Sequence, residues 1–203
     1  MEQMKYEQYR PLARTGDIAL FDGKGAVSCL IKWFSRGDWS HVGLILRLDE
    51  WDCVLLWEST TLSDVADVES GKPRKGVQLV PLRNRIAGYD GRLAIRRIQK
   101  ELPSDKKAEL ARFRTMVRGR PYEESLIELA KAAWDGPFGK NTPDLSSLFC
   151  SEGVAAALQF IGLIGESIPS NEYTPDDFGT DTDVLTRQAA PGWAWGPETL
   201  IAD

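Results

Sequence analysis

The sequence is poor in the residue types that carry most metal, disulfide and pH-dependent chemistry. Its 203 residues include one histidine and three cysteines. Three cysteines at wide spacing do not make a disulfide framework, so we expect free thiols and a reducing, cytoplasmic location. No Cys-x-x-Cys or His-x-x-x-His spacing occurs, which argues against a zinc site made of Cys29, His41, Cys53 and Cys150. We therefore expect no metal and no cofactor.

Long apolar runs are also missing. No stretch approaches the roughly 20 apolar residues that a membrane span needs, and residues 1–10 are polar and charged, unlike a leader segment. No repeat or low-complexity tract is present. A chain with 42% hydrophobic and 27% charged residues can bury a substantial core, so we expect one domain over residues 1–203.

Charge is unevenly distributed along the chain. Residues 72–100 hold nine Lys or Arg and one acidic residue, whereas residues 165–203 hold eight Asp or Glu and one Arg. Two solvated faces that attract each other account for this pattern, and an anionic partner for the basic segment is the alternative. Nucleic acid is disfavoured as a partner, because the overall charge is −5 and the basic segment lacks interleaved aromatics.

The hydrophobic pattern predicts an α+β fold, with an antiparallel sheet of about five strands packed against helices. Strands are expected at residues 18–21, 39–48, 53–59, 77–82 and 92–98. Helices are expected at residues 26–34, 103–118 and 123–134, and from about 150 to 164. The tail at residues 191–197 is rich in Trp and is expected to pack against the body of the protein.

Strands 39–48 and 53–59 form a predicted β-hairpin around the polar turn that begins at Asp49. With a two-residue loop, His41 faces Glu58 across the hairpin. With a four-residue loop it faces Thr60, and Glu58 is its diagonal neighbour on the same face. An odd loop length without a bulge would separate the two side chains, so the inference depends on an even loop.

Cys150 lies at the start of the fourth predicted helix. From Val154 to Ile164 the apolar residues are dense, so this helix is expected to be buried with only its first turn reaching solvent. Ser146 and Ser147 are plausible helix caps. Unpaired N–H groups and the positive end of the helix dipole at a helix start favour a thiolate and can hold an oxyanion.

The three side chains fit nucleophilic catalysis by cysteine. His41 is the natural general base for Cys150, because no other side chain of the protein has an ordinary pKa near neutrality. Glu58 can accept the imidazole N–H and stabilise the imidazolium. Cys29, within the predicted helix 26–34, is expected to be a small buried apolar residue.

Five motifs, in this order, resemble the YiiX-like, circularly permuted papain-fold enzymes, which are relatives of NlpC-type endopeptidases and lecithin retinol acyltransferases. The motifs are Thr15-Gly16-Asp17-Ile18, Trp39-Ser40-His41-Val42-Gly43, Trp57-Glu58-Ser59, Phe149-Cys150-Ser151-Glu152 and residues 170–178. The histidine precedes the cysteine, as the permuted group requires. The resemblance spans about residues 14–178 and implies a permuted papain-like (NlpC-type) domain with the aromatic tail packed on it.

The resemblance implies Cys150 as nucleophile, His41 as base and Glu58 as the third, polar member, with the Cys150 backbone N–H as one oxyanion donor. Gly153 departs from the family pattern, where an aliphatic residue is more usual, and is expected to make room close to the backbone. Trp39, Ser40, Gly153 and Tyr173 are candidate pocket residues, and Tyr173 either closes the pocket or only packs.

The expected function is that of a cysteine-dependent hydrolase or acyltransferase that cleaves an amide or ester through a thioester. Amidase, peptidase, thioesterase and acyl-transfer chemistry remain open. The substrate is accordingly a small-molecule, peptide or lipid-like acyl compound, with no nucleic acid and no membrane span involved. The alternative is a binding protein that kept the fold without activity.

Overall fold

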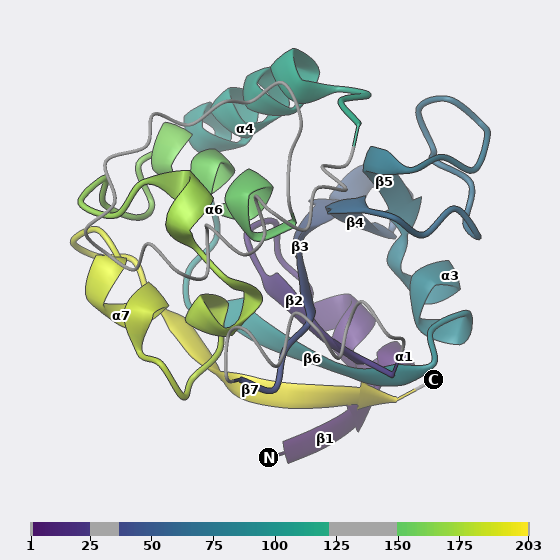
Figure 1. Cartoon of the computed structure of the whole chain (residues 1–203), viewed down its shortest axis with the longest axis horizontal. Coiled ribbons are helices and arrows are strands. Elements are labelled where there is room, and N and C mark those ends of the chain that lie inside the picture. The colour runs from purple at the N-terminus through teal and green to yellow at the C-terminus, as the bar shows by residue number, and fades with distance from the viewer. Residues whose placement is uncertain (1, 25–36, 122–149, 203) are drawn as a thin grey trace.

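The structure is a computed structural model that describes residues 2–24, 37–121 and 150–202 (Figure 1). Within these residues a seven-stranded mixed sheet forms the centre, in the order β1-β7-β6-β2-β3-β4-β5. The strands are β1 (Glu2–Lys5), β2 (Ile18–Gly23), β3 (His41–Leu48), β4 (Cys53–Thr60), β5 (Gly76–Pro81), β6 (Gly91–Ile98) and β7 (Trp195–Ala202). All neighbouring pairs are antiparallel except β1 and β7, which run parallel.

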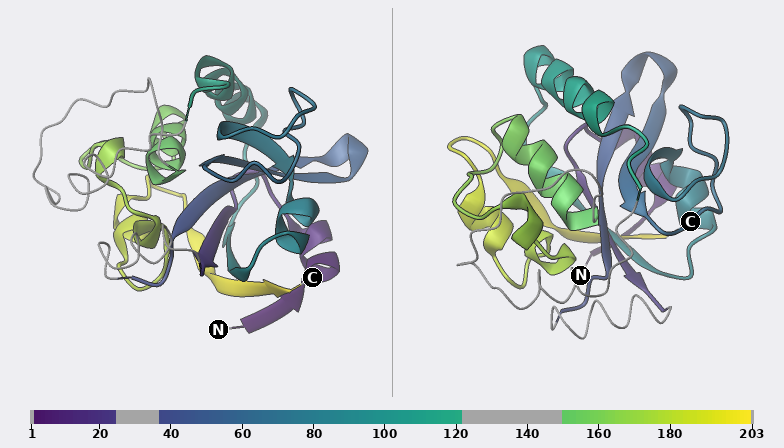
Figure 2. Two further views of the ribbon diagram at one scale, coloured as in Figure 1. Left: turned by 45° about the vertical axis from the view of Figure 1, so that its right-hand side comes forward. Right: turned by 45° about the horizontal axis from the view of Figure 1, so that its top comes forward.

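Helices cover both faces of this sheet (Figures 1 and 2). On one face lie α4 (Ser104–Val117) and α6 (Cys150–Phe160), and on the other lie α1 (Tyr6–Tyr9) and α3 (Leu82–Ala87). The remaining elements are α7 (Val184–Gln188) and the 3-10 turns η1 (Arg10–Leu12), η2 (Asp49–Trp51), η4 (Ser170–Glu172) and η5 (Pro175–Phe178). No described helix is long and apolar enough to cross a membrane.

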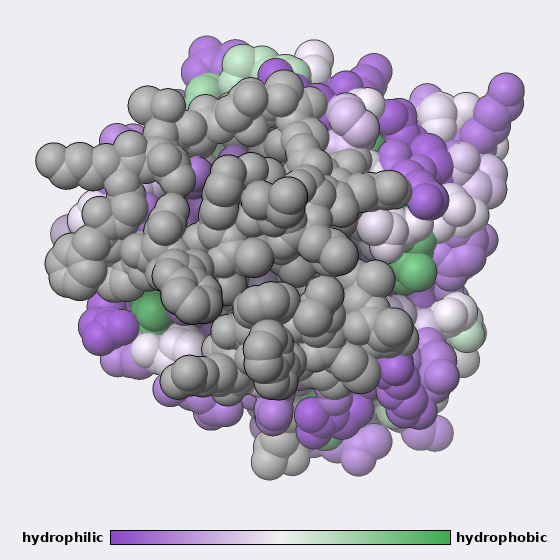
Figure 3. Space-filling model, in the orientation of Figure 1, coloured by the Kyte–Doolittle hydropathy of each residue, from purple (hydrophilic) through white to green (hydrophobic). Residues whose placement is uncertain are grey.

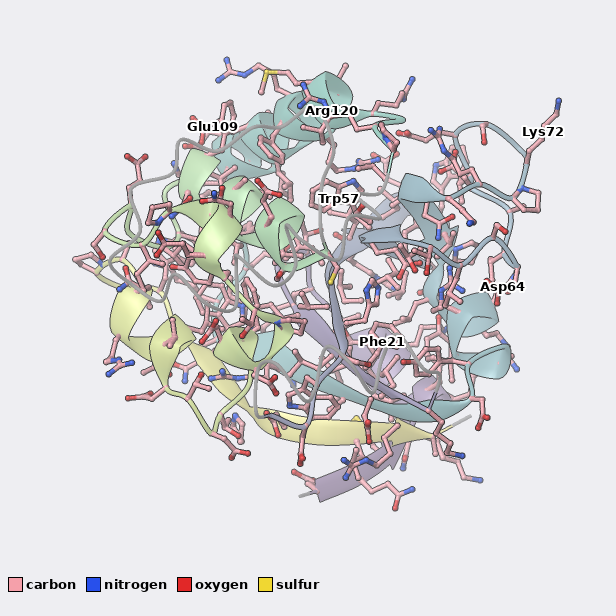
Figure 4. All side chains as sticks on the ribbon, in the orientation of Figure 1. Phe21, Trp57, Asp64, Lys72, Glu109 and Arg120 are labelled. Carbon is pink, nitrogen blue, oxygen red and sulfur yellow. The ribbon has the colours of Figure 1, made fainter. Side chains whose placement is uncertain are left out.

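The central strands are apolar on both faces because both faces are packed. Leu44 and Trp57 point into the core beneath α4 and α6, whereas Ile45 and Leu56 belong to the second core on the side of α1 and α3. This alternation follows from the two-residue period of a strand. Glu58, next to Trp57, consequently faces the side of α3. In Figure 4 Trp57 and Phe21 mark these two sides of the sheet.

Asp17 holds the turn before β2. Its side chain is fully buried and accepts hydrogen bonds from the Tyr9 hydroxyl (2.8 Å) and from the backbone N–H groups of Arg14 (3.0 Å) and Ile98 (2.8 Å). One carboxylate thus ties together α1, the turn and the end of β6. Burial raises the pKa of Asp17 to about 6, although these three hydrogen bonds oppose the shift.

The α+β class is confirmed, and the expected strands and the helix at 103–118 are present with small shifts in their ends. The sheet is larger than the five antiparallel strands expected, because β1 and β7 add two strands at one edge. Trp193 and Trp195 of the Trp-rich tail pack against the core, and the tail continues into β7. The predicted strand 77–82 ends at Pro81, and Leu82 starts α3, which the sequence did not predict. The helices expected at 26–34 and 123–134, with Cys29, Ser146 and Ser147, lie outside the described residues.

Candidate active site

The hairpin of β3 and β4 has the even loop on which the sequence argument depends. Leu48 pairs with Cys53 and Leu44 with Trp57, so four residues connect the strands. The last of them, Asp52, has a left-handed backbone (φ 46°) that closes the turn. Continued one pair at a time, this register places His41 opposite Thr60 and diagonal to Glu58. The expectation that His41 and Glu58 share a face is therefore confirmed.

His41 and Glu58 are in direct contact. His41 Nε2 lies 2.6 Å from Glu58 Oε2, and the two side chains are 14% and 0% exposed to solvent. The other carboxylate oxygen, Oε1, accepts three hydrogen bonds: from Arg85 Nε (3.0 Å), Arg85 Nη2 (2.7 Å) and Gln78 Nε2 (3.0 Å). Glu58 therefore divides its two oxygens between the imidazole on one side and a set of polar donors on the other.

Cys150 meets the imidazole from α6, which packs against β3 and β4. The thiol and the ring are hydrogen-bonded, and because Nε2 faces Glu58, Nδ1 is the nitrogen left for the sulfur. The backbone N–H groups of Val42 and Ser151 also donate to the sulfur. The first turn of α6 was expected to reach solvent, and this is wrong: Cys150 is 4% exposed, and Ser151, Glu152 and Gly153 are buried as well.

Electrostatics in this cluster favour separated charges. Burial by itself would lower the pKa of His41, but the facing thiolate of Cys150 and the carboxylate of Glu58 raise it to about 9. Burial would raise the pKa of Cys150, but the positive charge and hydrogen bond of His41 and the two backbone N–H groups lower it. The pKa of Glu58 is also lowered, because His41 and Arg85 outweigh its burial. The arrangement can hold a thiolate next to an imidazolium at neutral pH.

Trp39 and Ser40 lie directly before His41. Both are buried, and both are held by hydrogen bonds. The backbone N–H of Trp39 donates to Asp176 Oδ1 (2.8 Å), and its indole N–H donates to Glu198 Oε1 (3.2 Å). Ser40 accepts from the Gly23 N–H (3.0 Å) and donates to the Phe21 carbonyl (3.1 Å). These contacts fix the segment that delivers His41 to the start of β3.

Tyr173 and Gly153 are both buried. The ring of Tyr173 packs on Phe178, with 5.6 Å between centroids, and its hydroxyl has no hydrogen-bond partner among the described residues. A Cβ added at Gly153 would lie 3.8 Å from the Trp57 ring, an ordinary contact. The described neighbours of Gly153 therefore leave room for a small side chain and do not by themselves require glycine.

Sequence reasoning missed Arg85, Gln78 and Asp64. Arg85 belongs to the basic segment 72–100, which was interpreted as a solvated face or a site for an anionic partner, yet it is 1% exposed and paired with Glu58. Its remaining arm, Nη1, contacts Asp64 Oδ1 (2.7 Å) in the loop after β4, a position marked at the edge of the molecule in Figure 4. Arg96 of the same segment is likewise buried. It lies opposite Glu198 of the acidic segment in the register of β6 and β7, and its guanidinium donates to the carbonyls of Phe178 and Gly179.

Cys53, the other described cysteine, lies at the far end of β4 from Glu58 and is also a free thiol. Within the described ranges no group of three or more His, Cys, Asp or Glu side chains could hold a metal ion. The described surface on the face seen in Figure 3 is mainly hydrophilic, with scattered apolar side chains.

No protein-family model matches the chain, and no curated protein is significantly similar to it. Among solved structures it is similar to the crystal structure of the metalloprotein YiiX from Escherichia coli O157:H7. The TM-score is 0.52 at 22% sequence identity, and the match covers 75% of this chain and 69% of that one. The chain therefore has a YiiX-like fold, as the resemblance of its motifs predicted.

Proposed function

We propose that this protein is a cysteine-dependent hydrolase or acyltransferase, with Cys150 as nucleophile, His41 as general base and Glu58 as the orienting carboxylate. One observation carries the proposal: the only histidine of the chain is hydrogen-bonded to a buried cysteine on one side and to a buried carboxylate on the other. Nucleophile, base and orienter in hydrogen-bond contact are what cysteine acyl transfer requires.

The reaction begins with the proton of Cys150 on His41. The thiolate attacks the carbonyl carbon of an amide or ester, and the electron pair moves to the carbonyl oxygen. As the tetrahedral intermediate collapses, His41 gives its proton to the leaving nitrogen or oxygen, and a thioester remains on Cys150. Water or another acceptor then loses a proton to His41, attacks the thioester and releases the acyl group.

Glu58 serves each of these steps without losing its charge. Its Oε2 accepts the Nε2–H of His41, which keeps Nδ1 directed at the sulfur and stabilises the imidazolium. The backbone N–H of Cys150 is the proposed oxyanion donor, on the strength of the motif resemblance. The N–H groups of Val42 and Ser151 stabilise the thiolate before attack.

We further propose that the fold is a circularly permuted papain-like one. Support comes from the chain order, in which His41 and Glu58 on paired strands precede Cys150 on the helix packed against them. The free thiols of Cys53 and Cys150 support a reducing, cytoplasmic location. The substrate class is a small-molecule, peptide or lipid-like acyl compound.

The test is a substrate screen with matched variants. Wild type, Cys150→Ala, His41→Ala and Cys53→Ala are assayed against panels of aminoacyl amides, short peptides, fatty acyl esters and thioesters. We expect turnover by wild type and Cys53→Ala, none by Cys150→Ala, and an acyl adduct on Cys150 by mass spectrometry. If acyl electrophiles leave Cys150 unmodified and wild type turns over none of the panels, the proposal is wrong.

A further inference from the structure

Arg85 is a deeply buried charged group next to the candidate site, and its guanidinium bonds Glu58 and Asp64 rather than His41 or Cys150. It belongs to α3, the six-residue helix between β5 and β6, and its side chain is 1% exposed. Its Nε and Nη2 both donate to the same oxygen of Glu58, Oε1, at 3.0 Å and 2.7 Å. The Gln78 amide donates to that oxygen as well (3.0 Å).

This convergence determines how the carboxylate is oriented. With three donors on Oε1 and His41 on Oε2, any partial rotation of the carboxylate plane would lengthen hydrogen bonds at both oxygens, including the short contact with His41. Charge-assisted hydrogen bonds are the stronger kind, and a planar guanidinium holds its donors in a fixed geometry. Asp64, bonded to Nη1 at 2.7 Å, holds the outer arm of the guanidinium. The side chain is thus fixed on both sides.

The pairing also bears on the charge of Glu58. A carboxylate with no solvent exposure is costly to ionise. If its cationic partner is removed, an uncompensated buried charge remains. The other titratable groups that face Glu58 are His41 from β3 and Tyr89 from the turn after α3. Burial raises the pKa of Tyr89 to about 12, so it stays neutral. When His41 releases its proton during turnover, Arg85 is the cation that remains beside Glu58.

We propose that Arg85 is a positioning residue of this site: it keeps Glu58 ionised and its Oε2 directed at His41 while the imidazole gains and loses its proton. Its consequence for turnover rests on the proposed function. Gln78 adds a neutral hydrogen bond to the same oxygen and has the smaller effect. The basic segment of the sequence thereby contributes an inward-facing charge to the candidate site.

The test uses the single histidine as a reporter. In protein labelled with ¹³C and ¹⁵N at histidine, every imidazole signal belongs to His41, and its shift responds when Glu58 takes up a proton at low pH. Four variants are compared over the pH range in which circular dichroism shows a folded protein: Arg85→Gln, Arg85→Lys, Gln78→Leu and Arg83→Gln. Arg83, also on α3, is 60% exposed and pairs with Glu7 at the surface, so it is the matched control.

In Arg85→Gln we expect the acid step of the His41 titration to move up by at least about one pH unit, because a buried carboxylate has lost its fixed cation. kcat should fall roughly 10- to 100-fold with little change in KM. Arg85→Lys keeps the charge and loses the planar geometry, so its acid step stays near that of wild type while kcat still falls. The kcat of Gln78→Leu should fall less than that of Arg85→Gln. Arg83→Gln should match wild type in both kcat and the His41 titration.

The proposal is overturned if Arg85→Gln, or Arg85→Lys where the Gln variant does not fold, matches Arg83→Gln in both the titration and kcat. The two proposals fail in different ways. A wild type without turnover refutes the enzyme, while the His41 titration still tests Arg85. Turnover that depends on Cys150, together with a titration and a kcat that are both indifferent to Arg85, refutes this inference alone.

Discussion

Substituting Glu58 by Gln is the sharpest single test of the candidate site, because the contacts of Glu58 determine which way the amide will face. Arg85 and Gln78 place three donors on Oε1, and His41 places one on Oε2. A hydrogen bond to a charged group contributes about 1.5–3 kcal/mol. With two such bonds from Arg85, the amide oxygen is held toward Arg85 by about 3 kcal/mol or more, and the amide NH₂ group faces His41.

This orientation reverses the hydrogen bond to the imidazole. Facing an NH₂ group, His41 Nε2 must become an acceptor, so its proton moves to Nδ1, the nitrogen that faces Cys150. A neutral imidazole protonated at Nδ1 cannot take the thiol proton. The charge is lost as well: His41 has a pKa of about 9, against 6.5 ordinarily. Since one pKa unit is about 1.4 kcal/mol, its surroundings stabilise the imidazolium by about 3 kcal/mol, of which Glu58 supplies part.

The expected result is a fall of about 10⁴ in kcat, the size found when an orienting carboxylate is replaced by its amide and the tautomer is wrong. A second assay needs no substrate: the rate of Cys150 alkylation by iodoacetamide against pH. At pH 6 a thiol of ordinary pKa, about 8.5, is about 0.3% thiolate, so Glu58→Gln should alkylate up to about 300-fold more slowly than wild type. Because the same sulfur is compared, the limited access to Cys150 cancels.

Wild-type kcat and an unchanged alkylation profile in Glu58→Gln would refute the reasoning, and Glu58 would have to be replaced as the third member of the site. Glu58→Ala is the companion variant. It removes the buried partner of Arg85 Nε and Nη2, while the contact of Nη1 with Asp64 stays, and should lower the free energy of unfolding by about 3 kcal/mol. The stability of both variants is measured by urea unfolding, so that loss of fold and loss of chemistry are separated.

Three further predictions concern the thiol, the core and pH. Near pH 6–7, Cys150 should alkylate faster than the more exposed Cys53, because His41 lowers the pKa of Cys150; mass spectrometry of the labelled peptides decides, and faster labelling of Cys53 would contradict it. Gly43→Ala should lower the free energy of unfolding by about 1–3 kcal/mol, since its Cβ would lie 2.6 Å from a Leu56 methyl; an unchanged urea midpoint would show that Leu56 can move. The pKa of Asp17 is raised by burial to about 6, so the folded state binds more protons than the unfolded one between about pH 4 and 6. The contribution of Asp17 to the free energy of unfolding therefore favours folding below this range and is lost as the pH rises, by about 3 kcal/mol at pH 7. The difference in the free energy of unfolding between wild type and Asp17→Asn should accordingly narrow from pH 4.5 to pH 7.

The parts of the fold that the sequence predicted are those where local pattern and tertiary environment agree. Strands β3 and β4 are separated by a short polar turn, and their register follows from the loop length. The contact between His41 and Glu58 could be predicted for the same reason, because these two residues of one hairpin share a face when the loop between the strands has an even length. Cys150 could be linked to them only through the order of the motifs, since its contact with His41 spans more than 100 residues.

The features that the sequence did not predict have physical causes of another kind. β7 contains Pro197, which normally argues against an inner strand, but the pairing of β6 with β7 is irregular between Arg96 and Ile98, where the proline is accommodated. Arg85 was assigned to the surface because arginine is rarely buried, and its partner Glu58 lies 27 residues earlier. The first turn of α6 is buried by long-range packing, which a helical period does not reveal.

The position of β7 between β1 and β6 has a consequence for biosynthesis. β1 is translated before every other described strand, yet its hydrogen-bonding partner in the sheet is β7, which is translated after all of them. While the chain is still on the ribosome, β1 must wait as an unpaired edge segment, and β6 keeps an open edge on the side that β7 will occupy. A nascent chain that stalls before residue 195 therefore lacks two strands of the sheet rather than one, and exposes two edges to chaperones or to neighbouring chains.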